Sequence, residues 1–163
     1  ALDHVYHRLA DDCADEFTTF GLDAPDYMYM HQHFISGEVF SVGEDYMQYV
    51  VSSYVFTGGA HGYSTDCYMT FDTNTGDRIT VDDIVADRSA LLDLLTAKVR
   101  ADDRAFEDAE VFIPEVFLLD EGGITFIYDP YAIGCYASGA IDITLTEDEL
   151  DGILRPGAKK YWE

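Results

Sequence analysis

The sequence predicts an α+β fold, in which an antiparallel β-sheet is packed by a central helix and accompanied by an N-terminal helix. Aromatic and β-branched residues fill several extended segments that Gly-rich turns separate. Apolar residues recur at helical spacing in two other segments. With 163 residues, 48% of them hydrophobic, the chain is long enough to bury one core. We therefore expect one domain over residues 1–163, with the N-terminal helix and strands in 1–72 and a hairpin, helix, hairpin, strand and helix in 73–163.

The first helix is expected over residues 2–20. Its apolar residues lie three or four positions apart: Leu2, Val5, Tyr6, Leu9, Cys13 and Phe17. Gly21 provides a C-cap, and Pro25 prevents the helix from resuming. Extended segments follow over 27–35 and 38–42, with a turn at Ser36–Gly37. Residues 46–56 are aromatic and β-branched on both faces, which predicts a long central strand covered on both sides.

The stretch Thr57-Gly-Gly-Ala-His-Gly62 then interrupts the strand pattern with three glycines and one imidazole. Glycine permits positive φ and close backbone approach, so the stretch predicts a sharp, crowded turn. His61 is either an exposed polar group at a binding surface or a structural imidazole bonded to loop backbone. We favour the structural interpretation, and we keep Gly58, Gly59 and His61 as candidate ligand-binding residues.

Beyond this turn, residues 64–72 predict a strand, and 72–77 a hairpin turn leading to a short strand at 78–80. The hairpin superficially resembles a calcium loop, but Gly76 and Asp77 stand in the wrong order for one. Thr80 can cap a helix with acids in its first turn. The apolar stripe of that helix is Leu91, Leu92, Leu94, Leu95, Val99 and Phe106. The acidic run at its end is interpreted as a solvated face.

The last third of the chain predicts a hairpin of strands 115–119 and 124–128, joined through residues 120–123. An irregular loop rich in Gly and Tyr follows over 129–139, and Tyr131 and Tyr136 on it are further candidate ligand-binding residues. Apolar and polar residues alternate over 141–145, which is typical of a strand with one face exposed to solvent. Thr146 and Glu149 form a capping box for a short helix around 147–154.

Charge is the outlier in the composition: 32 acidic against 9 basic residues give a net charge of −23. Such a surface repels nucleic acid and anionic membranes and attracts basic partners or cations. It also keeps a protein soluble without any partner. The charge therefore excludes a nucleic-acid-binding class and favours a basic ligand, if there is a ligand.

The sequence holds no complete catalytic constellation, and we assign no catalytic residue, cofactor or metal ligand. Cys67 or Cys135 with His61 as base has the residue types of a thiol nucleophile, but nothing in the sequence brings them together. His4 with His7, and His31 with His33, have spacings that metal ligands use but lack a third ligand. The three cysteines, Cys13, Cys67 and Cys135, allow either one disulfide with a leftover thiol or three buried free thiols.

Two stretches together resemble a known family. The first is Tyr54-Val-Phe-Thr-Gly-Gly-Ala-His-Gly62 followed by Thr70-Phe-Asp-Thr-Asn-Thr-Gly-Asp-Arg-Ile-Thr-Val-Asp-Asp-Ile84. The second is Asp120-Glu-Gly-Gly-Ile-Thr-Phe-Ile-Tyr-Asp-Pro-Tyr-Ala-Ile-Gly-Cys-Tyr-Ala-Ser-Gly139 with the strand and helix after it. Over residues 25–155 the chain is similar to the extracytoplasmic domain of RsiV-type anti-sigma factors and to the module beside the catalytic domain of PdaC-type peptidoglycan deacetylases.

The resemblance implies an exported α+β domain without catalytic residues of its own, in the periplasm or at the cell surface. It also implies tethering through a lipid or membrane anchor upstream of these residues. In the anti-sigma branch it implies a surface that senses lysozyme, a strongly basic protein. We therefore expect an extracytoplasmic binding or sensing domain for a basic protein. The alternatives are a cell-wall polysaccharide-binding module, whose tyrosines would stack on sugars, and a component of a peptidoglycan-modifying hydrolase. We also expect His61 to contact the loop at 130–139.

Overall fold

The computed structural model describes residues 31–58, 60–120 and 122–161. The chain divides into two compact units, a first unit of residues 1–36 and 52–66 and a second unit of residues 37–51 and 67–163. The predicted helix over 2–20 and the start of the segment at 27–35 lie outside the described residues, as do Gly59 and Trp162. The expectation of a single domain over 1–163 stays a prediction.

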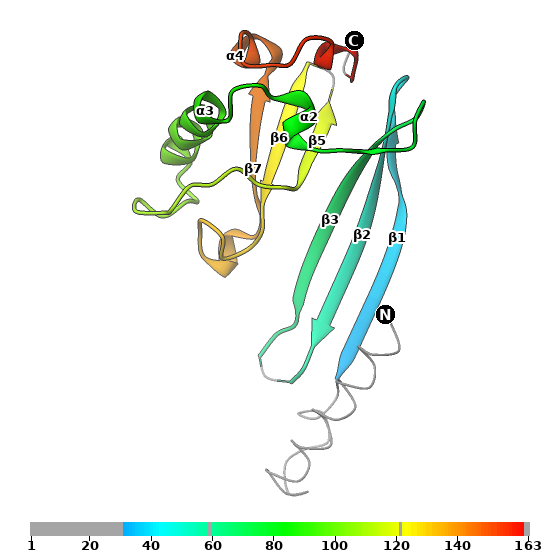
Figure 1. Cartoon of the computed structure of the whole chain (residues 1–163). Helices are drawn as coiled ribbons and strands as arrows, with labels where there is room; N and C mark the ends of the chain where they lie inside the picture. The colour runs from blue at the N-terminus through cyan, green and yellow to red at the C-terminus, as the bar shows by residue number, and fades with distance from the viewer. Residues whose placement is uncertain (1–30, 59, 121, 162–163) are drawn as a thin grey trace, which may run out of the picture. The chain divides into compact units, whose positions relative to one another are not determined.

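A four-stranded antiparallel sheet has the order β1-β2-β3-β4 and contributes residues to both units (Figure 1). Its strands are β1 (Gln32–Val42), β2 (Tyr46–Phe56), β3 (Tyr63–Asp72) and β4 (Arg78–Ile79). The predicted bounds of β2 and the hairpin at 72–77 are confirmed. β2 has a strand on either side, but Gln48 and Val50 are its buried residues and the others are half-buried. The expectation that both of its faces are covered is therefore wrong.

The predicted turn at Ser36–Gly37 is also wrong, because β1 runs through both residues without interruption. Gly37 lies directly against the ring of Tyr49, and a Cβ at this position would overlap that ring. Glycine permits this close approach of an aromatic side chain to the strand.

The second unit contains a second antiparallel sheet, of order β5-β6-β7. Its strands are β5 (Phe117–Asp120), β6 (Gly123–Tyr128) and β7 (Ile141–Thr146), with Leu119 opposite Ile124 and Thr125 opposite Thr144. The predicted hairpin through 120–123 is confirmed. The α+β class is also confirmed, with two antiparallel sheets where one was expected.

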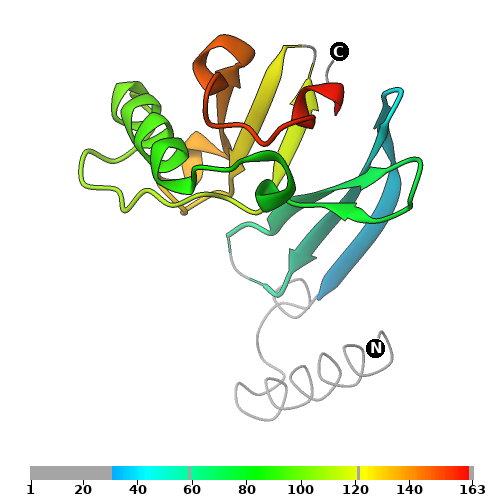
Figure 2. The same ribbon diagram turned by 45° about the horizontal axis from the view of Figure 1, so that its top comes forward.

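Short helices accompany this sheet: α2 (Val81–Ile84), α4 (Glu147–Leu150) and the 3-10 turns η2 (Tyr136–Ser138) and η3 (Ala158–Tyr161). The long helix α3 (Arg88–Ala101) lies beside the β7 edge (Figures 1 and 2). Leu91, Leu95 and Val99 of α3 are buried in one apolar core with residues from all three strands of the sheet. The central packing helix is thus confirmed. Among the described residues, no helix has the length and apolar character needed to cross a membrane.

The single helix predicted from Thr80 onward is in fact two helices. Thr80 and Asp83 do form a capping box, but it opens only α2. Val85 is extended and bridges to Leu154, and Asp87 then caps α3 by accepting hydrogen bonds from Ser89 N and Ala90 N, each at 3.0 Å. Phe106 lies beyond the end of α3 and is 50% exposed, so its predicted place in the apolar stripe is wrong.

A buried amide and the hydroxyl of Tyr46 link the two sheets in the second unit, and Tyr46 OH donates to Leu119 O at 3.4 Å. The side chain of Gln48, on β2, is fully buried. In the orientation that satisfies its neighbours, Nε2 donates to Leu119 O at 3.1 Å and to Ser41 Oγ at 2.8 Å, and Oε1 accepts from Leu119 N at 2.9 Å. Leu119 lies on β5, an edge strand of its sheet. One side-chain amide therefore pairs with both backbone polar groups of an edge residue, as a neighbouring strand would.

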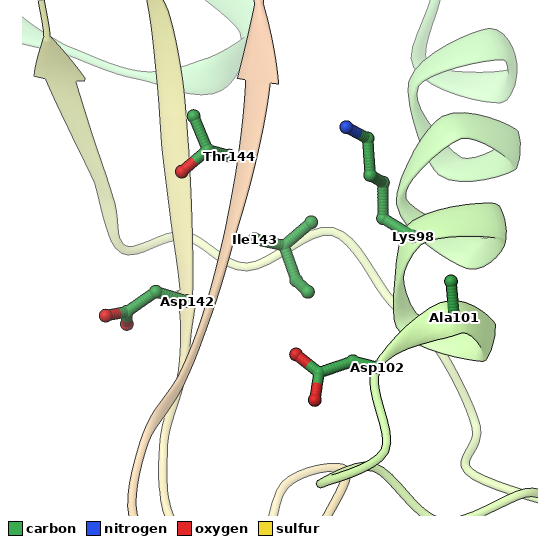
Figure 3. A pocket seen from close by; sticks show the side chains of 6 residues that line it. All are labelled: Lys98, Ala101, Asp102, Asp142, Ile143 and Thr144. Carbon is green, nitrogen blue, oxygen red and sulfur yellow. The ribbon is translucent and has the colours of Figure 1, made fainter.

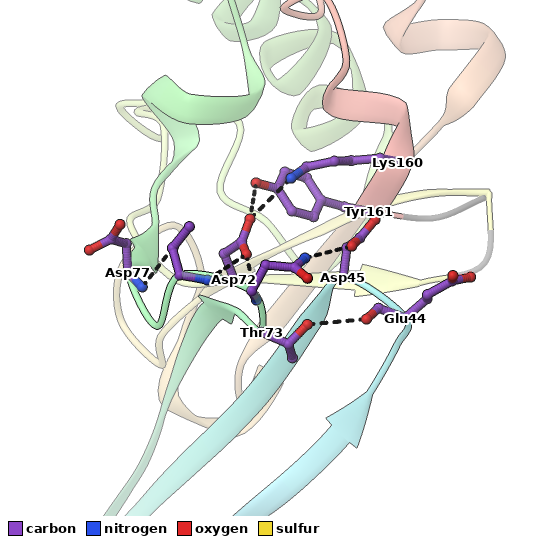
Figure 4. Close-up of polar contacts among 9 residues, drawn as sticks. Glu44, Asp45, Asp72, Thr73, Asp77, Lys160 and Tyr161 are labelled. Carbon is purple, nitrogen blue, oxygen red and sulfur yellow. Dashed lines mark hydrogen bonds and ion pairs between the residues drawn. The ribbon is translucent and has the colours of Figure 1, made fainter.

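Asp72, at the end of β3, anchors the C-terminal part of the second unit (Figure 4). Its carboxylate accepts hydrogen bonds from Asn74 N at 2.8 Å and from Lys160 Nζ at 3.0 Å, and Tyr161 OH donates at 3.3 Å. The hydrogen bond from Lys160, then those from backbone amides, lower the pKa of Asp72 to about 2 although its burial opposes the shift. Asp72 thus holds η3 against the β3–β4 turn.

Candidate functional site

The glycine-rich turn lies between β2 and β3 in the first unit. Gly58 has a φ of 97°, which requires glycine, and Gly59 lies outside the described residues. A Cβ at Gly62 would overlap the ring of Tyr54. The imidazole of His61 is exposed, and its Nδ1 lies 3.1 Å from Gly62 O, so both interpretations of this residue stay open. The glycines therefore serve the turn and a ring that packs on it.

Tyr131, in the second unit, is the non-glycine residue with a positive φ among the described residues. Ala132 N donates to Asp129 O at 2.9 Å, which closes a turn with Pro130 and Tyr131 at its centre. Tyr131 has a φ of 73°, so the turn is of type II, and its third position normally holds glycine. A left-handed conformation costs a non-glycine residue roughly 1–2 kcal/mol.

The ring of Tyr131 is 61% exposed, so burial does not offset this strain. The ring stacks on that of Tyr136, with the centroids 5.3 Å apart and the planes 28° from parallel. The structure thus brings together the two tyrosines predicted from the sequence. One face of the pair is presented at the surface by a strained turn.

The loop that carries these tyrosines is attached to the segment after α3. Phe106 N donates to Ile133 O at 2.8 Å, and Ala105 forms an antiparallel bridge with Gly134. Ser138 Oγ donates to Arg104 O at 3.3 Å. We call the surface made by residues 102–112 and 129–139 the paired-loop surface.

The paired-loop surface combines exposed aromatic rings with acidic side chains. Its exposed rings are Phe106, Phe112 and Tyr131, and its exposed acids are Asp103, Glu107, Asp108, Glu110 and Asp129. The ring of Phe112 packs edge-on against Tyr128 with the centroids 5.3 Å apart, and Tyr128 OH donates to Phe112 O at 2.7 Å. Aromatic residues are the side chains that most often dominate the energetics of protein interfaces.

A shallow groove of about 240 Å³ borders this surface, between the end of α3 and β7 (Figure 3). Lys98 and Ala101 of α3, with Asp102 just after the helix, line one side of it, and residues 142–144 of β7 line the other. Ile143 points toward α3, whereas Asp142 and Thr144 point to the other side of the strand (Figure 3). The clean alternation predicted at 141–145 is confirmed, with Asp142 on the wet face.

Carboxylates outnumber cations around this groove. Arg104 forms an ion pair with Asp102 at 2.6 Å, and that hydrogen bond, followed by the charges of Asp142 and Asp103, raises the pKa of Arg104. Lys98 pairs with Glu149 at 2.7 Å. Four carboxylates thus act on two cations, which leaves the groove acidic.

Other cations of the second unit are also engaged within the fold. Arg88 pairs with Asp82 and Lys159 with Glu147, each at 2.6 Å. Arg100 donates to the backbone oxygen of Ala109 at 2.8 Å. Because the cations are few and serve internal contacts, the excess of carboxylates dominates the charge of the surface.

The two described cysteines, Cys67 and Cys135, are free and exposed, so neither the disulfide nor the buried-thiol alternative holds for them. Cys135 Sγ lies 3.3 Å from Ser138 Oγ, and this hydrogen bond lowers the pKa of the thiol. Within the described ranges, no three His, Cys, Asp or Glu side chains are grouped as metal ligands would be.

The predicted site residues therefore fall into two sets. Gly58 and His61 share a turn of the first unit, and Tyr131 and Tyr136 form a stacked pair in the second. The predicted contact between His61 and the 130–139 loop would join the two units and stays a prediction. Sequence reasoning missed Phe106 and Phe112 as surface residues. It assigned Phe106 to a helix stripe, although the run Asp102-Asp-Arg-Ala-Phe106 is dense in charge.

By its fold, the protein belongs to the α+β class and has two antiparallel sheets. Residues 79–148, from β4 to the start of α4, match the family model described as "Protein of unknown function (DUF3298)". No curated protein matches the chain in sequence.

Two crystal structures of DUF3298 family proteins share the fold. One, from Bacteroides fragilis, superposes with a TM-score of 0.79 at 24% identity, over 98% of this chain and 68% of that one. The other, from Pseudomonas aeruginosa PAO1, gives a TM-score of 0.62 at 22% identity, over 78% of this chain and 64% of that one. This chain is thus similar to about two thirds of each of those proteins.

Proposed function

We propose that this protein is a non-catalytic binding domain of the cell envelope, and that it takes a basic protein on its paired-loop surface. The observation that carries the proposal is Tyr131, an exposed aromatic residue held at a glycine position of a type II turn. Strained residues of this kind persist where the strain serves a site. Neither the burial of the Tyr131 ring nor its own backbone preference explains why a tyrosine stands there.

The charge of the protein supports a basic partner. The net charge is −23, and near the paired-loop surface Arg104 is paired with Asp102, Lys98 with Glu149, and Arg100 with backbone oxygens. Exposed rings among carboxylates match arginine and lysine side chains, which stack on aromatic faces while they pair with acids. An acidic surface also accelerates the approach of a cationic protein.

The cellular setting rests on the resemblance to RsiV-type anti-sigma factors and PdaC-type deacetylases. We place the domain outside the cytoplasm, in the periplasm or at the cell surface, with any lipid or membrane anchor upstream of these residues. Lysozyme is the basic protein that this resemblance favours. In this role the domain contributes no cofactor and no catalytic group.

A calorimetric titration with hen lysozyme at several ionic strengths tests the proposal. We expect binding at low salt that weakens steeply as salt is added, because the attraction between exposed charges is screened within about 10 Å at 0.1 M. A second acidic protein of similar size, titrated in parallel, should show no binding. Absence of binding to lysozyme at low ionic strength would contradict the proposal.

A cell-wall polysaccharide is the second candidate ligand, and the exposed face of the Tyr131–Tyr136 stack favours it. Sugar rings stack on aromatic faces without charge, so glycan binding should be nearly independent of salt. Titration with soluble peptidoglycan fragments separates the two candidates by this salt dependence. If the wild-type protein turns over these fragments and His61→Ala abolishes turnover, the domain is instead a hydrolase component.

A further inference from the structure

We infer that the basic partner binds in part as an extended segment, which adds to the β7 edge of the three-stranded sheet in the groove beside α3. The inference rests on the proposed function and specifies how that ligand is held. It starts from the topology, in which β7 pairs with β6 alone among the described strands of its sheet.

The hydrogen bonds of the sheet fix which backbone groups face the groove. Ile127 N donates to Val116 O at 3.1 Å, so Ile127 directs its polar groups toward the β5 side. In an antiparallel ladder the direction alternates, so Phe126 and Tyr128 direct theirs toward β7. Their partners on β7 are Ile143 and Ile141.

The alternation continues along β7. Because Ile141 and Ile143 exchange hydrogen bonds with β6, Asp142 and Thr144 direct their N–H and C=O groups away from β6. A second hydrogen bond supports this assignment: Glu147 N donates to Gly122 O at 2.6 Å. Glu147 therefore directs its N–H toward the β6 side, as Ile141 and Ile143 do. Asp142 and Thr144 are also the residues that line the groove with Ile143.

The groove thus offers a helix on one side and a strand edge on the other, which is an arrangement that extended peptides use to add a strand to a sheet. Its floor carries Ala101, a small side chain that leaves room beside the edge. The acids Asp102, Asp103, Asp142 and Glu149 exceed the cations Lys98 and Arg104 there. Charge complementarity therefore selects a basic segment, and the groove continues into the paired-loop surface through Asp102.

A peptide alternating Lys and Val is a direct probe of this mode. Its matched control has the same sequence and charge but is N-methylated at every second residue, which removes the N–H groups that a ladder needs. We expect the unmethylated peptide to bind about tenfold or more tightly than the methylated one, since each lost ladder bond weakens binding. Equal binding of the two peptides, or no binding of either, would overturn the inference.

Substitutions in the groove provide an independent test with lysozyme as ligand. Thr144→Pro removes the N–H that faces the groove but leaves the backbone hydrogen bonds to β6, and proline is tolerated at such edge positions. Thr144→Val keeps the N–H and is the matched control, because both variants lose the side-chain hydrogen bond to Thr125 at 2.9 Å. We expect Thr144→Pro to bind lysozyme about tenfold more weakly than Thr144→Val, and equal binding by the two variants would overturn the inference.

A charge variant covers the case in which Thr144→Pro does not fold. Ala101→Lys places a cation in the groove, and Ala97→Lys places the same charge on an exposed position of α3 one turn earlier, outside the groove. Weaker binding for Ala101→Lys alone supports the inference. If lysozyme binds the wild-type protein and both variants alike, the extended mode is wrong while the proposed function stands; if lysozyme does not bind the wild-type protein, the proposed function itself fails.

Discussion

Tyr131 stacks on Tyr136 with ring centroids 5.3 Å apart, and it does so from a backbone conformation that favours glycine. The stack lies on a loop that hydrogen bonds to the segment after α3, where Phe106 and several carboxylates are exposed. Stacking contributes about 0.5–1.5 kcal/mol, which is comparable to the cost of the left-handed conformation. The two contributions offset each other, so the exposed ring adds little to stability, and for this reason we propose a binding role for it.

Replacing Tyr131 separates stability from binding. For Tyr131→Gly, relief of strain offsets the lost stacking and the added chain entropy, so the free energy of unfolding should stay within about 1 kcal/mol of the wild-type value. Tyr131→Ala keeps the strain and loses the ring, and should be the less stable variant. Both should bind lysozyme about tenfold more weakly. Urea unfolding and calorimetry measure the two effects, and unchanged affinity in both variants would remove Tyr131 from the site.

Neutralising the acids beside Arg104 should weaken binding in a salt-dependent way. Asp103→Asn combined with Asp142→Asn removes two charges that act on Arg104. We expect slower association with lysozyme and a smaller dependence of affinity on salt, because exposed charges govern steering. Asp77→Asn combined with Asp93→Asn removes the same two charges at exposed positions outside this surface and is the control for net charge. An identical loss in this control would mean that overall charge, rather than this surface, attracts the partner.

The buried amide of Gln48 should be among the most sensitive positions for stability. Gln48→Met fills nearly the same space but leaves Leu119 N buried without its partner, whereas Leu119 O keeps the hydrogen bond from Tyr46 OH at 3.4 Å. An unsatisfied buried group costs about 1–3 kcal/mol, so the free energy of unfolding should fall by about that amount. Ser41→Ala removes only one contact of the amide and should cost about 1 kcal/mol or less. Urea denaturation compares them; a similar small loss in both would show that Gln48 does not hold the two sheets together.

The lowered pKa of Asp72 predicts that the stability of the fold depends on pH. Its pKa is lowered from 3.8 to about 2, so the ionised carboxylate stabilises the folded state at pH values above 4. This contribution is lost as the pH falls from about 4 through about 2. Asp72→Asn should therefore be less stable than wild type at neutral pH, and the difference should shrink toward pH 2. Thermal unfolding across this range measures it. If the difference in stability does not depend on pH, Asp72 stabilises the fold through packing and hydrogen bonds and not through its charge.

Much of the fold could be predicted from local sequence. The aromatic and β-branched residues of 46–56 predicted both ends of β2, and the predicted capping box of Thr146 and Glu149 is present at the start of α4. These features depend on residues close together in the chain. The break between α2 and α3 could not be predicted in the same way, because Ala86 N bonds to Ile153 O, a partner far along the sequence.

The candidate site was predicted only in part for the same reason. Gly and Tyr between Pro130 and Gly139 marked the loop that holds the stack, since such residues indicate irregular backbone. The partner segment carries no matching signal. Its attachment depends on Gly134, where a Cβ would lie 2.6 Å from Arg104 O, and one glycine among 13 does not reveal such a contact.

The central claim is that a basic protein binds the paired-loop surface. Mapping backbone amide chemical shifts by NMR during a lysozyme titration at low salt tests it most directly, because every amide reports its own surroundings. We expect the shifts to concentrate in residues 102–112 and 129–139 and along β7. Shifts confined to other residues, such as those of β1 or the β3–β4 turn, would contradict it.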